Sequence, residues 1–174
     1  MDDKTIVNAE AKNYLTYLLA SFDETQKIIT SGNLAIDALL NHTIGQCSQG
    51  KIRLTTKINI SSIKGINHTD LCIILGNALD NAIEACKKVL DMNRRFIHIH
   101  IFRKKVYLII KITNSRATER FVHEKKLFHT TKEDKINHGF GLQNINKTVQ
   151  KYDGHLHIKT TDNTFYLSII MKNS

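Results

Sequence analysis

Residues 74–85 of this 174-residue chain read ILGNALDNAIEA, and this stretch predicts a helix with two different faces. Apolar residues recur in and around it at steps of three and four, which is the spacing of one helix face. On another face the same spacing aligns the polar residues Asn77, Asn81, Glu84 and Lys88. The apolar face consists of Leu71, Leu75, Ala78, Ala82, Cys86 and Val89.

The asparagine pair on this helix indicates a ligand-binding role rather than a face that only contacts solvent. Asn77 and Asn81 lie one turn apart and offer two amide oxygens to a hard cation such as Mg²⁺. A nearby lysine can then meet phosphates that the cation holds. A solvated helix face is the alternative, but asparagine is a mediocre helix former, and two of them flank Asp80 in mid-helix. This pattern favours a functional site.

Composition narrows the classes of protein. The chain has 25 Lys+Arg against 16 Asp+Glu, a net charge of +9, which attracts polyanions, nucleotides included. The basic residues are scattered without interleaved aromatics, so a dedicated nucleic-acid platform is a weaker interpretation. The three cysteines, Cys47, Cys72 and Cys86, lack metal-ligand spacing, and we expect small core residues of a reduced, cytosolic protein.

Nothing in the sequence predicts membrane insertion or secretion. No apolar run approaches the ~20 residues that cross a bilayer. The start of the chain, MDDK, leads into a polar stretch and not into a secretion signal. We therefore expect the chain itself to be soluble.

The chain divides into a helical start and a mixed remainder. Residues 8–30 carry an apolar helical stripe, residues 31–33 interrupt it, and a second helical pattern runs to residue 50. The first helix has more apolar surface than a lone helix should show, so we expect it to pair with another chain or with a segment outside this sequence.

Strand patterns dominate after residue 50. The expected order is a strand over 52–60, the asparagine helix, a hairpin of strands 96–103 and 106–113 joined through residues 104–105, a polar segment over 114–138, a helix over 142–151, and strands over 155–160 and 165–171. This order predicts an α+β fold, a two-layer sandwich with helices on one face of a mixed sheet.

Three further segments suit the binding of a nucleotide. Asn114 stands where a strand ends and can accept a hydrogen bond from an adenine amine, although an ordinary turn residue is an even alternative. The loop residues Thr131 and Lys132 offer a hydroxyl and a charge to phosphates if the loop closes; otherwise they belong to a polar loop. The run Gly139-Phe140-Gly141-Leu142 opens a helix, where backbone N–H groups favour a phosphate. It follows no strand, which argues against a Rossmann turn.

Taken in order, these segments resemble the GHKL ATPases, which include histidine kinases, gyrase, Hsp90 and MutL. Asn77 and Asn81 resemble the N box, and Asn114 stands where the G1 box begins. Residues 128–132 resemble the F box, and residues 139–142 resemble the G2 box.

The resemblance covers residues 10–171 and is closest to the catalytic domain of AgrC-like, quorum-sensing sensor histidine kinases. That group has Leu-Asp-Asn-Ala-Ile-Glu-Ala in its N box, as residues 79–85 do here. It also has a Gly-Asn hinge and an Asp-x-x-Leu helix, which residues 32–33 and 37–40 match.

This resemblance implies a Bergerat-type site for ATP and Mg²⁺ under a mobile lid over residues 115–138. Asn81, with Asn77 beside it, would hold Mg²⁺, and Lys88 or Lys87 would steady the phosphates. The remaining nucleotide-binding positions would be Asn114 at the adenine, Thr131 and Lys132 from the F box, and Gly139, Gly141 and Leu142 from the G2 box. Gyrase-like relatives carry a Glu base where Asn77 stands. Because Asn cannot activate water, the site fits phosphoryl transfer to a protein histidine better than ATP hydrolysis.

The chain departs from the family pattern at two boxes. The G1 box normally starts with Asp and contains glycines, whereas this chain has Asn114-Ser115-Arg116. The G2 box has Asn137 where its first glycine usually stands. Both changes affect the expected affinity for a nucleotide, because one acceptor is lost and the backbone is less free.

The acceptor histidine is not evident. None of the nine histidines lies in an acceptor motif on the N-terminal helices. We therefore expect residues 1–32 to be the second helix of a dimerisation hairpin and residues 33–174 to be the catalytic domain. The histidine and a membrane sensor would lie outside this chain.

The predicted function is the ATP-binding domain of a sensor histidine kinase that serves a response regulator. It would dimerise through the N-terminal helices of the full-length protein, bind no nucleic acid, and reach a membrane only through an N-terminal sensor region. One alternative is an anti-sigma-factor-type serine kinase. Another is a non-catalytic interaction domain of the same fold that has lost nucleotide binding.

Overall fold

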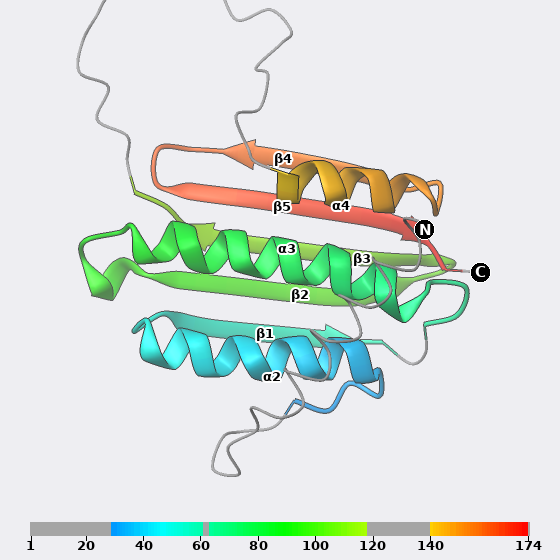
Figure 1. Ribbon diagram of the computed structural model, residues 1–174, viewed down its shortest axis with the longest axis horizontal. Coiled ribbons are helices and arrows are strands. Elements are labelled where there is room, and N and C mark those ends of the chain that lie inside the picture. Colours follow the sequence, from blue (N-terminus) through cyan, green and yellow to red (C-terminus); the bar gives the residue numbers. More distant parts are fainter. Residues whose placement is uncertain (1–28, 61–62, 118–139, 174) are drawn as a thin grey trace, which may run out of the picture.

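The structure, a computed structural model, describes residues 29–60, 63–117 and 140–173. These residues form a five-stranded sheet with helices packed on one face (Figure 1). The predicted α+β two-layer sandwich is confirmed. The strands are β1 (Arg53–Asn59), β2 (Phe96–Lys104), β3 (Tyr107–Ser115), β4 (His155–Thr160) and β5 (Thr164–Lys172); the helices are α2 (Leu34–Gln49), α3 (His68–Lys87), α4 (Phe140–Gln150) and the short 3₁₀ helix η1 (Met92–Arg94).

Asparagine side chains begin two of these helices in a chain that has no proline. The Asn33 carboxamide oxygen accepts hydrogen bonds from the backbone N–H groups of Ala35 and Ile36, at 3.1 and 3.2 Å. Asn67 accepts one from the N–H of Thr69 at 2.8 Å. These bonds satisfy donors that the first turn of a helix leaves without intrahelical partners. The helix break predicted at residues 31–33 is therefore followed by a helix whose first turn is capped by Asn33.

The sheet is mixed, with strand order β1-β2-β3-β5-β4. β1 runs parallel to β2, and the other neighbouring strands pair antiparallel. The tight turn of the β2–β3 hairpin lies at Lys105 and Val106, one residue later than predicted. The ladder continues to the pair Lys104 and Tyr107, and Lys105 takes the left-handed conformation with φ of 55°. Continued pairing thus sets the position of the turn.

The three longer helices lie side by side across one face of the sheet, with α3 between α2 and α4 (Figure 1). Alternate residues of the central strands point towards these helices and are fully buried. On β2 these residues are Ile97, Ile99 and Ile101, and on β3 they are Leu108, Ile110 and Ile112. Burying such side chains contributes roughly 1.5–3 kcal/mol each to folding. The core therefore fixes α3 above the middle of the sheet.

The three cysteines are buried and unpaired, as predicted for small core residues. Burial raises the pKa of the Cys47 thiol to about 12 and that of the Cys72 thiol to about 11. Burial also raises the pKa of Cys86, whose Sγ donates to the carbonyl of Phe96 at 3.2 Å. These thiols are protonated at neutral pH, which fits a structural role.

Gly154 is required where α4 passes into β4. A Cβ atom at this position would lie 2.6 Å from the Ile170 carbonyl oxygen and 2.7 Å from a Val149 methyl group. Since no real Cβ atom approaches so closely, only glycine allows α4 to sit this near to β5. Besides forming the predicted turn at residues 153–154, this glycine thus lets α4 pack closely against β5.

In the parts of the chain that the structure describes, no helix combines the length and the apolar character needed to span a bilayer. The predicted helix over residues 8–30 lies almost entirely outside the described residues, as does the predicted lid from residue 118 onwards.

Arg95 ties the ends of two helices to the sheet. Its guanidinium donates to the carbonyl oxygens of Val89 at 2.9 Å, Gly50 at 2.8 Å and Lys87 at 3.2 Å. These carbonyls belong to the ends of α2 and α3 and the residues just after them, where backbone oxygens lack intrahelical partners. Arg95 therefore acts as a shared cap for both helices.

We expect Arg95→Ala to lower the free energy of unfolding by about 1.5 kcal/mol, because three charge-assisted hydrogen bonds are lost at a half-buried site. Urea denaturation monitored by circular dichroism measures this change. Arg94→Ala is the matched control, since the Arg94 side chain is exposed, and it should change stability by less than about 0.5 kcal/mol. Equal effects of the two substitutions would contradict the capping role.

Candidate functional site

The two faces predicted for α3 are confirmed. Every residue of the apolar stripe is buried, from Leu71 to Val89. On the polar side Asn77 is half-buried, whereas Asn81, Glu84 and Lys88 are exposed. Asn77 therefore sits at the boundary between the core and the surface, where a side chain can be held firmly and still face a ligand.

A backbone hydrogen bond orients the Asn77 side chain. Its amide nitrogen donates to the carbonyl oxygen of Ile73, one turn earlier, at 2.7 Å. This bond assigns the nitrogen to the helix backbone and leaves the side-chain oxygen on the side that Gly141 of α4 approaches. Asn81 makes no hydrogen bond to any residue that the structure describes. Two amide groups one turn apart are thus available on the exposed side of α3.

The first turn of α4 lies directly against these amides. A Cβ atom on Gly141 would lie 3.0 Å from Asn77 Oδ1 and 3.5 Å from Asn81 Nδ2. The absence of a side chain at Gly141 therefore lets the first turn of α4 pack closely against the asparagines of α3. Helix N-termini favour anions, and amide oxygens suit Mg²⁺. The residues predicted for the two boxes are thus brought together at one junction between the two helices, which we call the gap.

Asn114 supplies a second unsatisfied group. It lies near the end of β3, is 1 % exposed, and its side-chain nitrogen donates to the Ser115 carbonyl oxygen at 2.9 Å. Its side-chain oxygen is buried and has no hydrogen-bond partner among the described residues. A buried acceptor without a donor costs about 1–3 kcal/mol. The amine of an adenine ring would provide the missing donor, so the residue fits the predicted role.

Lys88 is engaged elsewhere. Its ammonium lies 2.7 Å from Glu84 Oε1, and both side chains are about two-thirds exposed, at 66 % and 67 %. The hydrogen bond from Lys88 holds the pKa of the Glu84 carboxyl below its usual value. Eleven residues separate Lys88 from Asn77, roughly 16 Å along the helix axis. The structure does not bring this lysine to the gap at Gly141, and its phosphate-binding role stays a prediction.

Of the other predicted positions, one is buried and the rest lie outside the described residues. Leu142 is buried and belongs to the main core cluster, so its contribution to the site is to anchor α4 beside Gly141. Thr131, Lys132 and Gly139 lie outside the described residues, together with the rest of the F box.

Asp80 faces away from the gap. Burial raises the pKa of its carboxyl, while the nearby charges of His42 and Lys87 act in the opposite direction. His42 belongs to α2, so the carboxyl of Asp80 lies towards that helix and not towards α4. The described residues contain no group of three or more His, Cys, Asp or Glu that could hold a metal ion. A cation here would therefore depend on amide oxygens and on the phosphates of its ligand.

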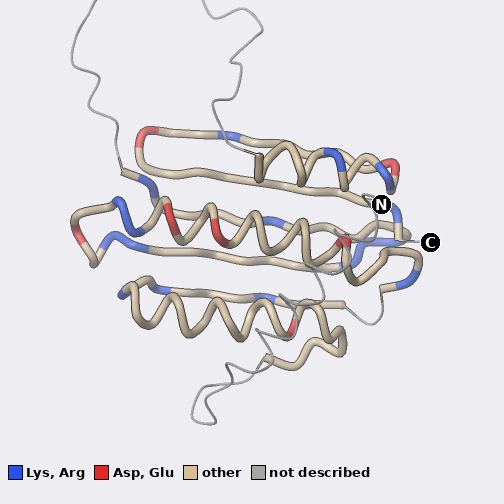
Figure 2. Tube along the Cα trace, in the orientation of Figure 1, with Lys and Arg blue, Asp and Glu red and all other residues tan. Residues whose placement is uncertain are grey.

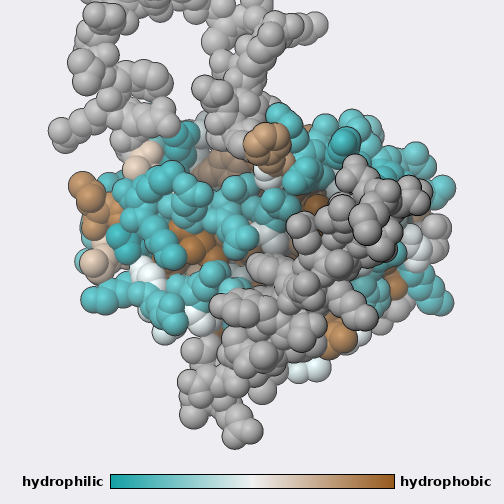
Figure 3. Space-filling view, in the orientation of Figure 1, coloured by the Kyte–Doolittle hydropathy of each residue, from teal (hydrophilic) through white to brown (hydrophobic). Residues whose placement is uncertain are grey.

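Phe140 is a residue that the sequence analysis passed over. It is the first residue of α4 and is 83 % exposed, directly before Gly141. Where coloured residues show in this view, most are hydrophilic and the hydrophobic ones form separate patches (Figure 3). A large aromatic residue between two glycines at a helix start was the available signal, since such a position favours small residues.

Comparison with known proteins assigns the family of this chain. The family model described as the GHKL domain matches residues 66–172, which include α3, the sheet from β2 to β5, and α4. The chain belongs to the GHKL family. This GHKL domain is 24 % identical over 162 residues to the probable C4-dicarboxylate sensor kinase of Halalkalibacterium halodurans. The match covers 87 % of this chain and 30 % of that relative, so the chain spans less than a third of its length.

Solved structures share the fold of the GHKL domain. The catalytic domain of the histidine kinase ThkA matches with a TM-score of 0.61 and 15 % identity, covering 85 % of this chain and 97 % of that one. The histidine kinase domain of the blue-light activated kinase EL346 from Erythrobacter litoralis matches with a TM-score of 0.62 and 13 % identity, covering 99 % and 76 %. The architecture is therefore that of histidine kinase catalytic domains.

Proposed function

We propose that this GHKL domain is the ATP-binding catalytic domain of a two-component sensor histidine kinase. It transfers the γ-phosphoryl group of ATP to a histidine on a dimerisation helix outside this sequence, for relay to a response regulator. Residues 1–32 supply the second helix of that dimerisation hairpin, and residues 33–174 form the catalytic domain. The family membership, the sensor-kinase relative and the AgrC-like N box support this proposal.

The observation that carries the proposal is the approach of Gly141 to the two asparagines of α3. This approach places Asn77 Oδ1 and the Asn81 side-chain amide beside the first turn of α4, where a phosphate chain with a cation would find both an amide oxygen and a helix N-terminus. Asn77, fixed by its bond to Ile73, orients the site, and Asn81 is the more accessible ligand. The unpaired oxygen of Asn114 selects adenine at the other end.

Phosphoryl transfer depends mainly on positioning and charge neutralisation. Mg²⁺, held by Asn81 and Asn77, would neutralise the phosphates of bound ATP. Neither asparagine can take a proton from water, so the site retains ATP until an acceptor arrives. Lys88 or Lys87, the loop residues Thr131 and Lys132, and the backbone at Gly139 complete the proposed contacts.

The full-length protein would dimerise through its N-terminal helices and reach a membrane through a separate sensor region. A non-catalytic interaction domain is the second candidate, because the G1 box of this chain has Asn114-Ser115-Arg116 in place of an acidic residue and glycines. An anti-sigma-factor-type serine kinase is the third. Only the histidine kinase and the serine kinase require a nucleotide.

Calorimetric titration with a non-hydrolysable ATP analogue tests the proposal. We expect saturable binding that weakens about tenfold when Mg²⁺ is removed by a chelator, since the cation offsets the phosphate charge. Asn81→Ala should bind as weakly with Mg²⁺ as the unmodified protein does without it. Asn144→Ala, an exposed asparagine of α4, is the matched control. Absence of binding at millimolar analogue would favour the interaction domain.

A further inference from the structure

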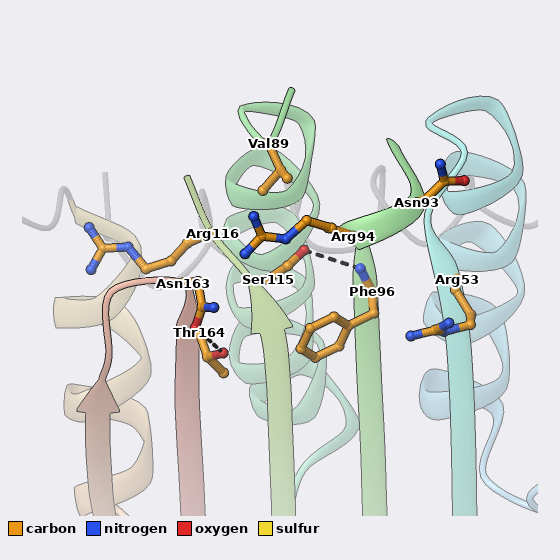
Figure 4. A pocket seen from close by; sticks show the side chains of 9 residues that line it. All are labelled: Arg53, Val89, Asn93, Arg94, Phe96, Ser115, Arg116, Asn163 and Thr164. Carbon is orange, nitrogen blue, oxygen red and sulfur yellow. Dashed lines mark hydrogen bonds between the residues drawn. The ribbon is translucent and has the colours of Figure 1, made fainter. Parts of the chain in front are cut away.

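A second cavity lies at the end of the sheet, apart from the gap between α3 and α4. It has a volume of about 280 Å³. Its lining comes from the starts of β1, β2 and β5, from the end of β3, and from η1, as Figure 4 shows. None of Asn77, Asn81, Asn114 or Gly141 lines it. Ser115, which lines the cavity, follows Asn114 in the chain.

Three arginines and no carboxylate line this cavity. Arg94 reaches over Ser115, Arg53 turns towards the ring of Phe96, and Arg116 lies on the rim and points outwards (Figure 4). The side chains of Arg53 and Arg94 are exposed and make no hydrogen bond or ion pair with any described residue. Arg95 differs, because backbone carbonyls occupy its guanidinium. Two arginines here thus keep their donors for a ligand.

The charges on the strands around the cavity also favour an anion. The five strands contain no aspartate or glutamate, and the acidic residues of the described chain lie on helices and turns (Figure 2). The face of the sheet that carries no helix therefore has basic groups without opposing carboxylates. Among them are Lys57, Lys111 and Lys159. An anion that approaches this face meets more basic than acidic groups, which raises its local concentration, although Asp91 and Asp162 lie in the turns beside the cavity.

The lining also selects the chemistry of the anion. Guanidinium groups present paired donors that match the oxygens of a phosphate. Val89 and the ring of Phe96 give the cavity an apolar side, and Asn163 and Thr164 add polar atoms. The volume exceeds what a bare phosphate fills and approaches the range of small-molecule sites. Aromatic rings also pack against arginine and against planar ligands.

We propose that Arg53, Arg94 and Phe96 form a binding site for a small organic phosphate, separate from the nucleotide gap. The phosphate lies between the two guanidinium groups, and the carbon part packs on Phe96 and Val89. Ser115 Oγ accepts a hydrogen bond from the Phe96 N–H at 3.1 Å, so the wall of the cavity is joined to the strand that carries Asn114. This site does not depend on ATP binding at α3 and α4.

Nuclear magnetic resonance titration with phenyl phosphate, in the presence of a chelator of Mg²⁺, tests the site on the full chain. We expect saturable amide shifts centred on Phe96, Ser115 and Thr164. Arg94→Gln should weaken binding about tenfold through the loss of one charge-assisted contact, and Arg53→Gln should act similarly. Lys159→Gln removes the same charge from β4, at a residue that does not line the cavity, and should change the affinity less than about twofold.

The following outcomes would contradict all or part of the proposal. Equal weakening by Lys159→Gln would show general charge attraction only. Shifts centred on Gly141 would place the ligand in the nucleotide gap. Inorganic phosphate is the second probe, and we expect it to bind more weakly than phenyl phosphate because it cannot pack on Phe96. Equal affinity for the two probes would overturn the organic part of the proposal and assign the cavity to free phosphate.

Discussion

Gly141→Val is expected to weaken binding of an ATP analogue at least about 100-fold, equivalent to about 2.7 kcal/mol. A Cβ atom at this position would already lie 3.0 Å from Asn77 Oδ1, and valine adds two methyl groups to it. Asn77 cannot move aside freely, since its nitrogen is bonded to the Ile73 carbonyl. The valine side chain therefore forces α4 and the asparagines of α3 apart and disturbs the place where the phosphates and the cation would bind.

The same substitution should shift the first turn of α4 away from α3 but leave the rest of the fold intact. Valine is a better helix former than glycine by a few tenths of a kcal/mol, and Gly141 lies in the first turn of α4. Thermal unfolding should show a melting temperature within a few degrees of the unmodified protein. Gln143→Val is the matched control, because Gln143 is exposed on the same helix. Unchanged affinity of Gly141→Val would sink the proposed site.

Asn114→Ala is expected to weaken binding of the ATP analogue about 30-fold, equivalent to about 2 kcal/mol. The substitution removes a buried acceptor that has no partner among the described residues and that we assign to the adenine amine. Guanine carries an oxygen where adenine carries this amine, so the unmodified protein should prefer ATP over GTP. The variant should lose that preference, and competitive titration with both analogues measures it.

The stability of Asn114→Ala separates recognition from folding. The variant loses the hydrogen bond from Asn114 to the Ser115 carbonyl, but it also loses an acceptor that was buried without a donor. These effects offset each other, so the free energy of unfolding should change by less than about 1 kcal/mol. Thr113→Ala, on the other face of β3, is the control and should leave nucleotide preference unchanged. Retained adenine preference in Asn114→Ala would assign recognition to another residue.

The helix–strand order of the described chain followed from local patterns. Steps of three and four residues predicted the buried face of α3, and alternation predicted the strands, because both periods reflect which side chains a regular backbone places together. The hairpin turn moved by one residue, since cross-strand pairing and not the turn sequence set its position. Contacts of this kind affect where a helix or strand begins and ends more than they affect whether a segment is a helix or a strand.

The candidate site was predicted in part. Motif order singled out Asn77, Asn81, Asn114 and Gly141. The structure brings Gly141 close to the two asparagines of α3 and leaves the Asn114 oxygen without a partner among the described residues, and their role in binding stays a prediction. The structure also pairs Lys88 with Glu84, which the i, i+4 spacing already allowed. The spacing alone could not decide between that ion pair and a phosphate contact, because both use the same exposed ammonium.

By itself, the sequence determined the helices, the strands and the faces that they bury, since neighbours in the chain decide those features. Only the tertiary structure decided that Gly141 of α4 lies against Asn77 of α3, and that Arg53, Arg94 and Phe96 line one cavity. Those contacts join residues far apart in the chain. They arise because burial of the isoleucine-rich strands fixes where each helix and strand end must lie.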